Sequence, residues 1–196
     1  MLSAILLAAG SSRRMGPVNK LLLPWQDRTV IYHTAEQLSA AAVGELIVVT
    51  GHEPAAIETA LHPLPVRFVH NPVHHTGMTS SIQTGIRIAR GDGFMICLAD
   101  MVLLTAGDYV LLKMAFEQQY RRDDHCIILP EYQNQTGNPV TFSRAYHDAL
   151  LALPEQEGAK SLVRANTPHH FRVAMSTDHI LRDLDTPGDY KTLPHR

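Results

Sequence analysis

The sequence predicts an α/β fold of the Rossmann-like type, in which a mostly parallel sheet lies between two layers of helices. Short apolar runs and helical patterns alternate along residues 1–130 with the spacing of β–α–β units. The run at residues 45–50 is apolar almost throughout, as expected of a parallel strand covered on both faces. The chain has 196 residues, of which 45% are hydrophobic, so we expect a single domain, residues 1–196, with a substantial core.

The expected strands are short apolar runs bounded by glycine, proline or polar residues. In chain order they cover residues 4–7, 45–50, 66–69, 94–98, 126–129, 137–142, 171–174 and 180–181. Pro139 has no backbone N–H to donate, so its strand is expected either at an edge of the sheet or with the proline at its entry.

The expected helices have apolar residues at spacings of three and four. They cover residues 29–42, 54–61, 80–89, 109–120, 144–153 and 158–165, with a short last helix that opens at 186. Pro54 suits a first helical turn, and Gly44 ends the helix before it. Thr105 and Asp108 fit a capping box. The short strands and closely spaced helices after residue 130 predict an elaborated C-terminal region that shapes part of a binding site.

A long cationic loop follows the first strand and carries the clearest functional signal. Residues 8–20 open with small residues, which let backbone N–H groups approach a ligand closely. The loop also contains Arg13, Arg14 and Lys20, although the formal net charge of the chain is -2. Arginine and lysine are the side chains that bind phosphate, and an ordinary connection needs only about four to six residues. The loop is therefore expected to bind a polyphosphate.

This loop fits neither of two common nucleotide-binding motifs. In a Walker loop, four residues separate two glycines and a lysine follows, whereas five residues separate Gly10 from Gly16 and Pro17 stands in the lysine's place. The Gly-x-Gly-x-x-Gly pattern of dinucleotide-binding proteins is also missing from the loop.

Two acids are candidate metal ligands at the same site. Asp100 follows the strand at 94–98, so it is delivered to the edge of the sheet that also receives the cationic loop. We expect it to bind Mg²⁺, because the alternative role of helix cap is already filled by Thr105. Near the C-terminus, Thr186 and Asp189 can form a capping box, which leaves Asp185 without a capping role. From the residues alone, Asp185 is either a ligand or an ordinary turn residue.

Three hydroxyl residues, Thr79, Ser80 and Ser81, stand at the start of an expected helix. Capping that helix needs only one of them, so the others are free to contact a nucleotide together with the backbone N–H groups.

Composition excludes several other classes of protein. A net charge of -2 and an isoelectric point near 6.6 do not fit a nucleic-acid-binding protein. The apolar runs are too short to span a membrane, and the first residues do not resemble a signal peptide. Cys97 and Cys126 lie in apolar runs and are expected to be buried free thiols. The spacing of the 12 histidines matches no metal-binding template. A cytoplasmic location is expected.

The first loop resembles the signature of a known enzyme family. Its pattern Leu-Ala-Ala-Gly-x-Ser-x-Arg-Met-Gly-x-x-Asn-Lys, at residues 7–20, is similar to that of small nucleotidyltransferases that attach nucleotides to molybdopterin. The segments at 77–85, 100, 137–139 and 185–190 follow in the family's order. The resemblance implies the nucleotide-diphospho-sugar-transferase type of fold. It also implies an Mg²⁺-dependent transfer of CMP from CTP to the terminal phosphate of molybdopterin, with release of pyrophosphate. Relatives that use GTP tend to have Leu-Ala-Gly-Gly where this chain has Leu-Ala-Ala-Gly.

The resemblance also implies roles for individual residues. Arg14 and Lys20 neutralise charge on the triphosphate and, with Asp100, form the catalytic set, while Asp100 and Asp185 bind Mg²⁺. The residues expected to bind the nucleotide come from the first loop and the third helix: Leu7, Ala8, Ala9, Gly10, Ser12, Arg14, Lys20, Thr79, Ser80 and Ser81. A molybdoenzyme or its chaperone is a possible partner.

The chain departs from the family pattern in three segments. It has Ala99-Asp100-Met101-Val102 where Gly-Asp-Gln-Pro is usual, and Gly137-Asn138-Pro139 where Gly-His-Pro is usual. Residues 155–160 read Glu-Gln-Glu-Gly-Ala-Lys where the family has Gly-Asp-x-Gly-Ala-Arg. The last two segments face the acceptor in relatives. Use of GTP, a sugar or alcohol phosphate acceptor, and a protein that binds nucleotide or molybdenum cofactor without turnover therefore stay open as alternatives.

Overall fold

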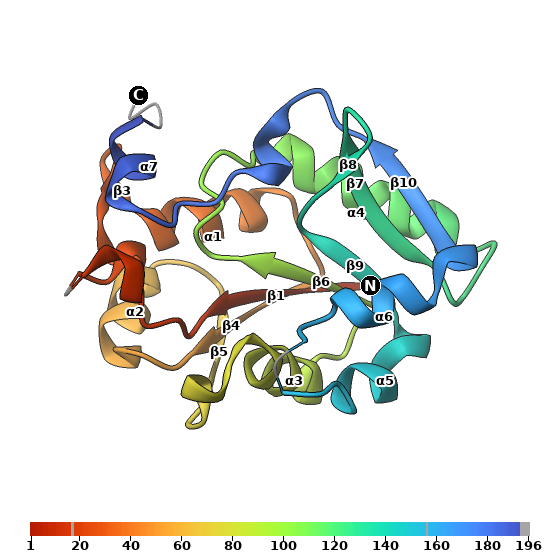
Figure 1. The fold of residues 1–196 in the computed structure, drawn as a ribbon, viewed down its shortest axis with the longest axis horizontal. Coiled ribbons are helices and arrows are strands. Elements are labelled where there is room, and N and C mark those ends of the chain that lie inside the picture. The colour runs from red at the N-terminus through yellow and green to blue at the C-terminus, as the bar shows by residue number, and fades with distance from the viewer. Residues whose placement is uncertain (17, 156, 193–196) are drawn as a thin grey trace.

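A computed structural model describes residues 1–16, 18–155 and 157–192. Pro17 of the first loop and Gln156 of the altered 155–160 segment lie outside these residues, as does the side chain of Arg13. Within the described part, eight strands form one sheet in the order β10-β7-β9-β6-β1-β4-β5, and β8 pairs with β7 (Figure 1). These strands are β1 (Leu2–Ala8), β4 (Glu45–Thr50), β5 (Arg67–His70), β6 (Gly93–Leu98), β7 (Ile127–Tyr132), β8 (Gln135–Thr136), β9 (Val140–Ser143) and β10 (His170–Ala174).

The sheet is mostly parallel, as predicted. β1 lies between β4 and β6 and is parallel to both, and β5 and β10 also pair in parallel with their neighbours. β9 is antiparallel to both β6 and β7, so β7 runs in the same direction as β6. A separate two-stranded hairpin joins β2 (Pro24–Trp25) and β3 (Arg28–Thr29).

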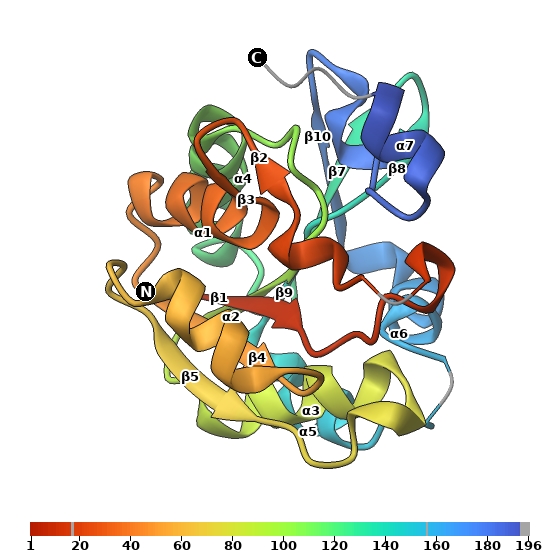
Figure 2. The ribbon, with the colours of Figure 1, turned by 90° about the vertical axis from the view of Figure 1, so that its left-hand side faces the viewer.

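Helices cover both faces of the sheet. One apolar core lies under α1 (Val30–Ala40), α2 (Pro54–Leu61) and α4 (Ala106–Tyr120). The other lies under α3 (Met78–Ile88), α5 (His147–Leu151) and α6 (Lys160–Ala165). Figure 2 looks toward the carboxyl end of β1, where the loop after β1 and the segment around α7 (Pro187–Thr192) lie on the viewer's side. None of the helices described in the structure combines the length and apolarity needed to cross a membrane.

Most expected elements are present, with small shifts at their ends. The strand at 45–50 and the helix at 54–61 have the expected bounds, and the capping box of Thr105 and Asp108 is formed in full. The expected helix at 144–153 is a 3-10 turn, Arg144–Tyr146, followed by α5. Helix α3 begins at Met78, two residues earlier than expected, after Gly77.

One expectation about the C-terminal region needs correction, and the structure decides between two alternatives for another. The predicted strand at 180–181 is part of a 3-10 helix, Asp178–Leu181, because one buried apolar residue, Ile180, anchors a turn as well as it would a strand. The strand that follows Pro139 does not lie at an edge: β9 sits between β6 and β7, and Pro139 precedes its first residue. The alternative placement of this proline, at the entry of the strand, is therefore confirmed.

Candidate active site

The cationic loop after β1 is closed by hydrogen bonds around Ser12. This residue has a left-handed backbone conformation with φ 50°, and its carbonyl accepts a hydrogen bond from the N–H of Met15 at 2.8 Å. Its hydroxyl accepts a second hydrogen bond, from the backbone N–H of Lys20 at 3.1 Å. The loop therefore turns back on itself, and the start of the short helix at Lys20–Leu22 is held beside Ser12.

The ammonium group of Lys20 lies between two carboxylates. Its Nζ is 2.6 Å from Oδ2 of Asp100 and 2.8 Å from Oδ1 of Asp185. Arg14 approaches the other oxygen of Asp185 from the outside, at 2.5 Å, with its side chain 71% exposed. Lys20 is only 14% exposed, so its charge is held inside the cleft whereas that of Arg14 lies at the rim.

The two acids are distant in sequence and are joined through the backbone. The N–H of Leu184 donates a hydrogen bond of 3.0 Å to the carbonyl of Asp100, and the Leu184 side chain is fully buried. Because side chains alternate along extended backbone, a buried Leu184 turns its two neighbours, Asp183 and Asp185, toward the cleft. Oxygen atoms of Asp100, Asp183 and Asp185 lie within 4.8 Å of one another.

Asp183 is a site residue that the sequence reasoning missed. The signal was present in the alternation Asp183-Leu184-Asp185, in which an apolar residue between two acids predicts that both acids share one face.

The electrostatics of the cleft depend on the balance between burial and pairing. Burial disfavours the charged form of Lys20, but Asp100 and Asp185 outweigh it, and the pKa of Lys20 is raised. Burial raises the pKa of Asp100, and this outweighs the opposing effect of Lys20, while the negative charge of Asp183 adds to the increase. Removal of Lys20 would thus leave three acids crowded together with no buried cation beside Asp100.

The carboxylates have the chemistry to hold a divalent cation. Oδ1 of Asp100 is buried and has no hydrogen-bond partner among the described residues, although a buried carboxylate oxygen normally has one. Hard cations such as Mg²⁺ prefer oxygen ligands, which Asp100, Asp183 and Asp185 all supply. The donor set and the unpartnered oxygen therefore fit a divalent metal.

A cleft of about 420 Å³ lies between the loop and these acids. Nine residues expected at the site line it: Leu7, Ala9, Gly10, Ser12, Arg14, Lys20, Ser81, Asp100 and Asp185. Five residues that line it were not expected: Leu21, Met78, Leu98, Ala99 and Asp183. Three expected residues, Ala8, Thr79 and Ser80, are outside its lining.

The hydroxyl residues of α3 are largely engaged in structural contacts. Thr79 donates to the carbonyl of Pro154 and accepts from the N–H of Gly158, which fastens the start of α3 to the segment before α6. Asn71 donates from its side-chain amide to both Ser80 and Ser81, at 2.9 Å and 3.0 Å. None of the three caps α3 through its side chain as an N-cap, because Gly77 takes that position.

A smaller cavity of about 180 Å³ adjoins the main cleft. It is lined by Gly137 and Asn138 of the altered Gly-Asn-Pro segment, while Leu98 and Asp183 line both cavities. The altered residues after Asp100 are not at the surface: Met101 and Val102 are 2% and 3% exposed and belong to the apolar core. The replacement of the usual Gln-Pro by Met-Val therefore changes the packing behind Asp100 and, through Met101, part of the lining of the smaller cavity.

A cationic loop of small residues faces the carboxylates at the carboxyl edge of the sheet, which is where ligands bind in open α/β sheets, and the charges suit a phosphorylated ligand. The chain belongs to the family described as the MobA-like NTP transferase domain, whose model matches residues 4–171. A solved structure of Rv0371c from Mycobacterium tuberculosis in complex with manganese matches 97% of this chain and 96% of its own, with 23% identity and a TM-score of 0.72.

Similar proteins share this class. The chain is 24% identical over its whole length to the molybdenum cofactor cytidylyltransferase of Escherichia coli, of which the match covers 96%. It is 26% identical, over 70% of its length and 61% of the relative, to a probable molybdenum cofactor guanylyltransferase of Methanosarcina mazei. Among solved structures, a nucleotidyl transferase from Methanothermobacter matches 97% of this chain and 94% of its own, with a TM-score of 0.82 and 25% identity. The expected class of enzyme and the expected fold are thus confirmed.

Proposed function

We propose that this enzyme transfers CMP from CTP to the terminal phosphate of molybdopterin, or of the molybdenum cofactor built on it. An oxygen of that phosphate attacks the α-phosphorus of CTP and forms a new phosphoanhydride bond. The bond between the α-phosphorus and the bridging oxygen to the β-phosphate breaks, and pyrophosphate leaves with the electron pair. The attacking phosphate is already ionised near neutral pH, so the enzyme needs no strong general base.

The position of Lys20 between Asp100 and Asp185 is the observation that supports the proposal best. The cleft combines a buried cation and a rim cation, Arg14, with three carboxylates and a loop of small residues. Arg14 and Lys20 would neutralise the triphosphate, and backbone N–H groups around Ala9 and Gly10 would lie against it. A divalent ion, Mg²⁺ in this proposal, would be held by Asp100 and Asp185 and would supply charge neutralisation at the α-phosphate.

The acceptor would occupy the smaller cavity. Asp183 and Leu98 line both cavities, so an acceptor seated beside Asn138 would lie next to the reacting phosphate of the nucleotide. In this proposal, Thr79 and Ser80 hold α3 in place, and Ser81 contacts the nucleotide.

The choice of CTP is supported by the cytidylyltransferase relative, which matches the whole chain, and by the Leu7-Ala8-Ala9-Gly10 sequence. Use of GTP is the alternative, favoured by the guanylyltransferase relative. The cytoplasm is the proposed location, because both cysteines are free and buried. A molybdoenzyme or its chaperone would receive the product.

The test is pyrophosphate release from CTP, GTP, ATP or UTP, each with Mg²⁺ and molybdopterin cofactor, by wild type, Asp100→Asn and Asp178→Asn. Asp178 is a half-exposed acid of the 3-10 helix at Asp178–Leu181, outside the lining of the cleft, and serves as the matched control. We expect release with CTP alone, lost in Asp100→Asn and kept in Asp178→Asn. Release with GTP alone would overturn the choice of base and keep the reaction.

No release with any nucleotide, despite measurable nucleotide binding, would contradict transfer to this acceptor. In that case, sugar and alcohol phosphates should be tried as acceptors before a protein that only binds the cofactor is considered.

A further inference from the structure

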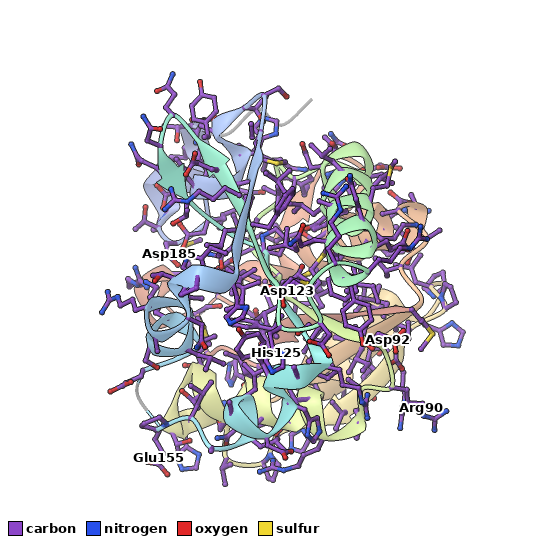
Figure 3. The ribbon with its side chains drawn as sticks, turned by 90° about the vertical axis from the view of Figure 1, so that its right-hand side faces the viewer. Arg90, Asp92, Asp123, His125, Glu155 and Asp185 are labelled. Atoms are coloured by element: carbon purple, nitrogen blue, oxygen red, sulfur yellow. The ribbon has the colours of Figure 1, made fainter. Side chains whose placement is uncertain are left out.

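A second cluster of metal-ligating side chains lies at the opposite edge of the sheet from the cleft. Asp123, Asp124 and His125 precede β7, which runs in the same direction as β6, so they stand at the amino edge of the strands. Each offers one ligand atom, and these atoms lie within 4.8 Å of one another. Figure 3 views this side of the molecule and shows Asp123 and His125 close together.

A second imidazole reaches the same place from another part of the chain. His169 ends the 3-10 turn before β10, and its Nδ1 lies 2.9 Å from Oδ2 of Asp123. The rings of His125 and His169 are 5.7 Å apart between centroids. Parallel pairing of β7 with β10 brings these two histidines together, which sequence spacing did not predict. The cluster therefore holds two carboxylates and two imidazoles.

Tyr146 adds an independent sign that a ligand belongs here. It is 5% exposed, and its ring meets that of His125 edge-on at 6.2 Å. Its hydroxyl is buried without a hydrogen-bond partner among the described residues. Burial, and after it the charge of Asp123, raise the pKa of Tyr146. A buried hydroxyl without a partner is costly, and a bound ion with its water would supply one.

We propose that Asp123, Asp124, His125 and His169 bind a divalent transition-metal ion of the Zn²⁺ type. Mixed imidazole and carboxylate ligands suit Zn²⁺, whereas Mg²⁺ prefers oxygen alone. His169 now lies 2.9 Å from Asp123, and His125 lies 2.8 Å from Asp124, measured between nitrogen and oxygen. The ion would replace the proton in each of these two hydrogen bonds. The hydrogen-bonded pairs would have to separate by about 0.5 Å to admit bonds of about 2.0–2.1 Å. His169 contacts Asp123 but lies outside the group whose ligand atoms are all within 4.8 Å of one another, so its ring would have to move closer to the other ligands. The side chain of Asp124 is 77% exposed and free to move that far.

Such an ion would act as a clamp between segments that are distant in sequence. It would join the turn before β7 to the start of β10, next to the 3-10 turn that carries Tyr146. The proposal does not depend on the reaction in the cleft, since the two sites lie at opposite edges of the sheet.

The test is calorimetric titration of the whole chain with Zn²⁺ in excess Mg²⁺, which occupies the oxygen ligands of the cleft. Wild type is compared with Asp123→Asn, His169→Asn and His147→Asn. His147 is the matched control, because its Nδ1 also lies 2.7 Å from the carboxylate of the next residue, Asp148. Loss even of outer partners of a ligand typically weakens metal binding about 10–100-fold. We therefore expect binding to weaken at least about tenfold in the first two variants and to stay unchanged in His147→Asn.

Two further readouts separate a metal site from a change in folding. Co²⁺ in place of Zn²⁺ should give the visible absorption of an ion with nitrogen ligands in wild type, lost in His169→Asn. Zn²⁺ should raise the melting temperature of wild type and leave that of His169→Asn unchanged. His169 is 40% exposed, so its replacement leaves the core intact. Equal Zn²⁺ binding by all four proteins, or none by wild type, would overturn the proposal.

Discussion

The hydroxyl of Thr34 in α1 donates a hydrogen bond of 3.1 Å to the carbonyl of Ala99, the residue before Asp100. Thr34 is 1% exposed, so this contact joins the buried face of α1 to the end of β6, where the carboxylate of Asp100 stands. The backbone at Asp100 is thus held from two sides, by Thr34 through its neighbour and by Leu184 at its own carbonyl.

Replacement of Thr34 with valine should therefore affect both stability and catalysis. Valine keeps the shape of the side chain but leaves the buried carbonyl of Ala99 without this partner, which costs about 1–3 kcal/mol of unfolding free energy. A lower rate at saturating substrate should accompany the loss, because Asp100 is less firmly placed. Urea unfolding and steady-state kinetics measure the two effects. Thr59→Val is the control, since Thr59 bonds only within α2 and should cost little.

Replacement of Lys20 with glutamine should make the protein more dependent on metal. Without the ammonium, Asp100, Asp183 and Asp185 repel one another, so the melting temperature in the absence of metal should fall. Mg²⁺ should then raise it by more than in wild type, since the ion no longer competes with Lys20 for the carboxylates.

The rate of nucleotide transfer should also fall in Lys20→Gln, by about 10²–10³-fold, as for the loss of one preorganised charge-stabilising donor. Lys113→Gln is the control, because Lys113 donates to carbonyls at the end of α1 and is outside the cleft lining. An equal response of both variants to Mg²⁺ would contradict the competition between Lys20 and the metal.

The ion pair of Lys20 should give stability a defined dependence on alkaline pH. The pKa of Lys20 is raised in the folded state above its ordinary value of 10.5, against the effect of burial, by Asp100 and Asp185. A raised lysine pKa stabilises the fold fully below 10.5, and this stabilisation is lost as the pH rises through the folded-state pKa. Urea unfolding of wild type and Lys20→Met at a series of pH values from about 9 upward should show the difference in stability shrinking with pH. A constant difference would contradict the raised pKa.

Replacement of Gly137 with alanine should disturb the acids of the cleft from a distance. A Cβ at this position would lie 2.1 Å from the carbonyl oxygen of Ile180, so the 3-10 helix just before Asp183 would have to shift. We expect a loss of about 1–3 kcal/mol in unfolding free energy, together with lower activity. Gly107→Ala is the control, because a Cβ there meets only the hydroxyl of Thr105, at 3.6 Å, and should be neutral or stabilising.

Local patterns predicted much of this fold because they depend on neighbouring residues. The apolar run at Glu45–Thr50 and the box of Thr105 and Asp108 needed no distant contact to be recognised. The position of β9 between β6 and β7 could not be predicted in this way, because it depends on pairing between distant segments. The strand predicted at Ile180-Leu181 was wrong for another reason. Two apolar residues are too few to show a periodicity that distinguishes a strand from a turn.

The candidate site likewise has features that local sequence predicted and features that depend on contacts between distant segments. Asp100 was predictable because a strand delivers it to the edge that receives the loop, and Lys20 because the loop carries it. Their contact with each other was not predicted, and neither was the place of Asp183 beside them. The 3-10 turn before β10 likewise brings His169 to Asp123, and sequence spacing gave no sign of it.

The cleft joins Lys20 to Asp185, so its buried cation is translated well before the last of the acids that face it. While the chain is still emerging from the ribosome, the strands up to β6 can pair, but the loop after β1 has only Asp100 to balance its charge. The last acids arrive when nearly the whole described chain has been translated. A nascent or truncated chain that stops before residue 183 would therefore carry the cationic loop without two of its three opposing carboxylates.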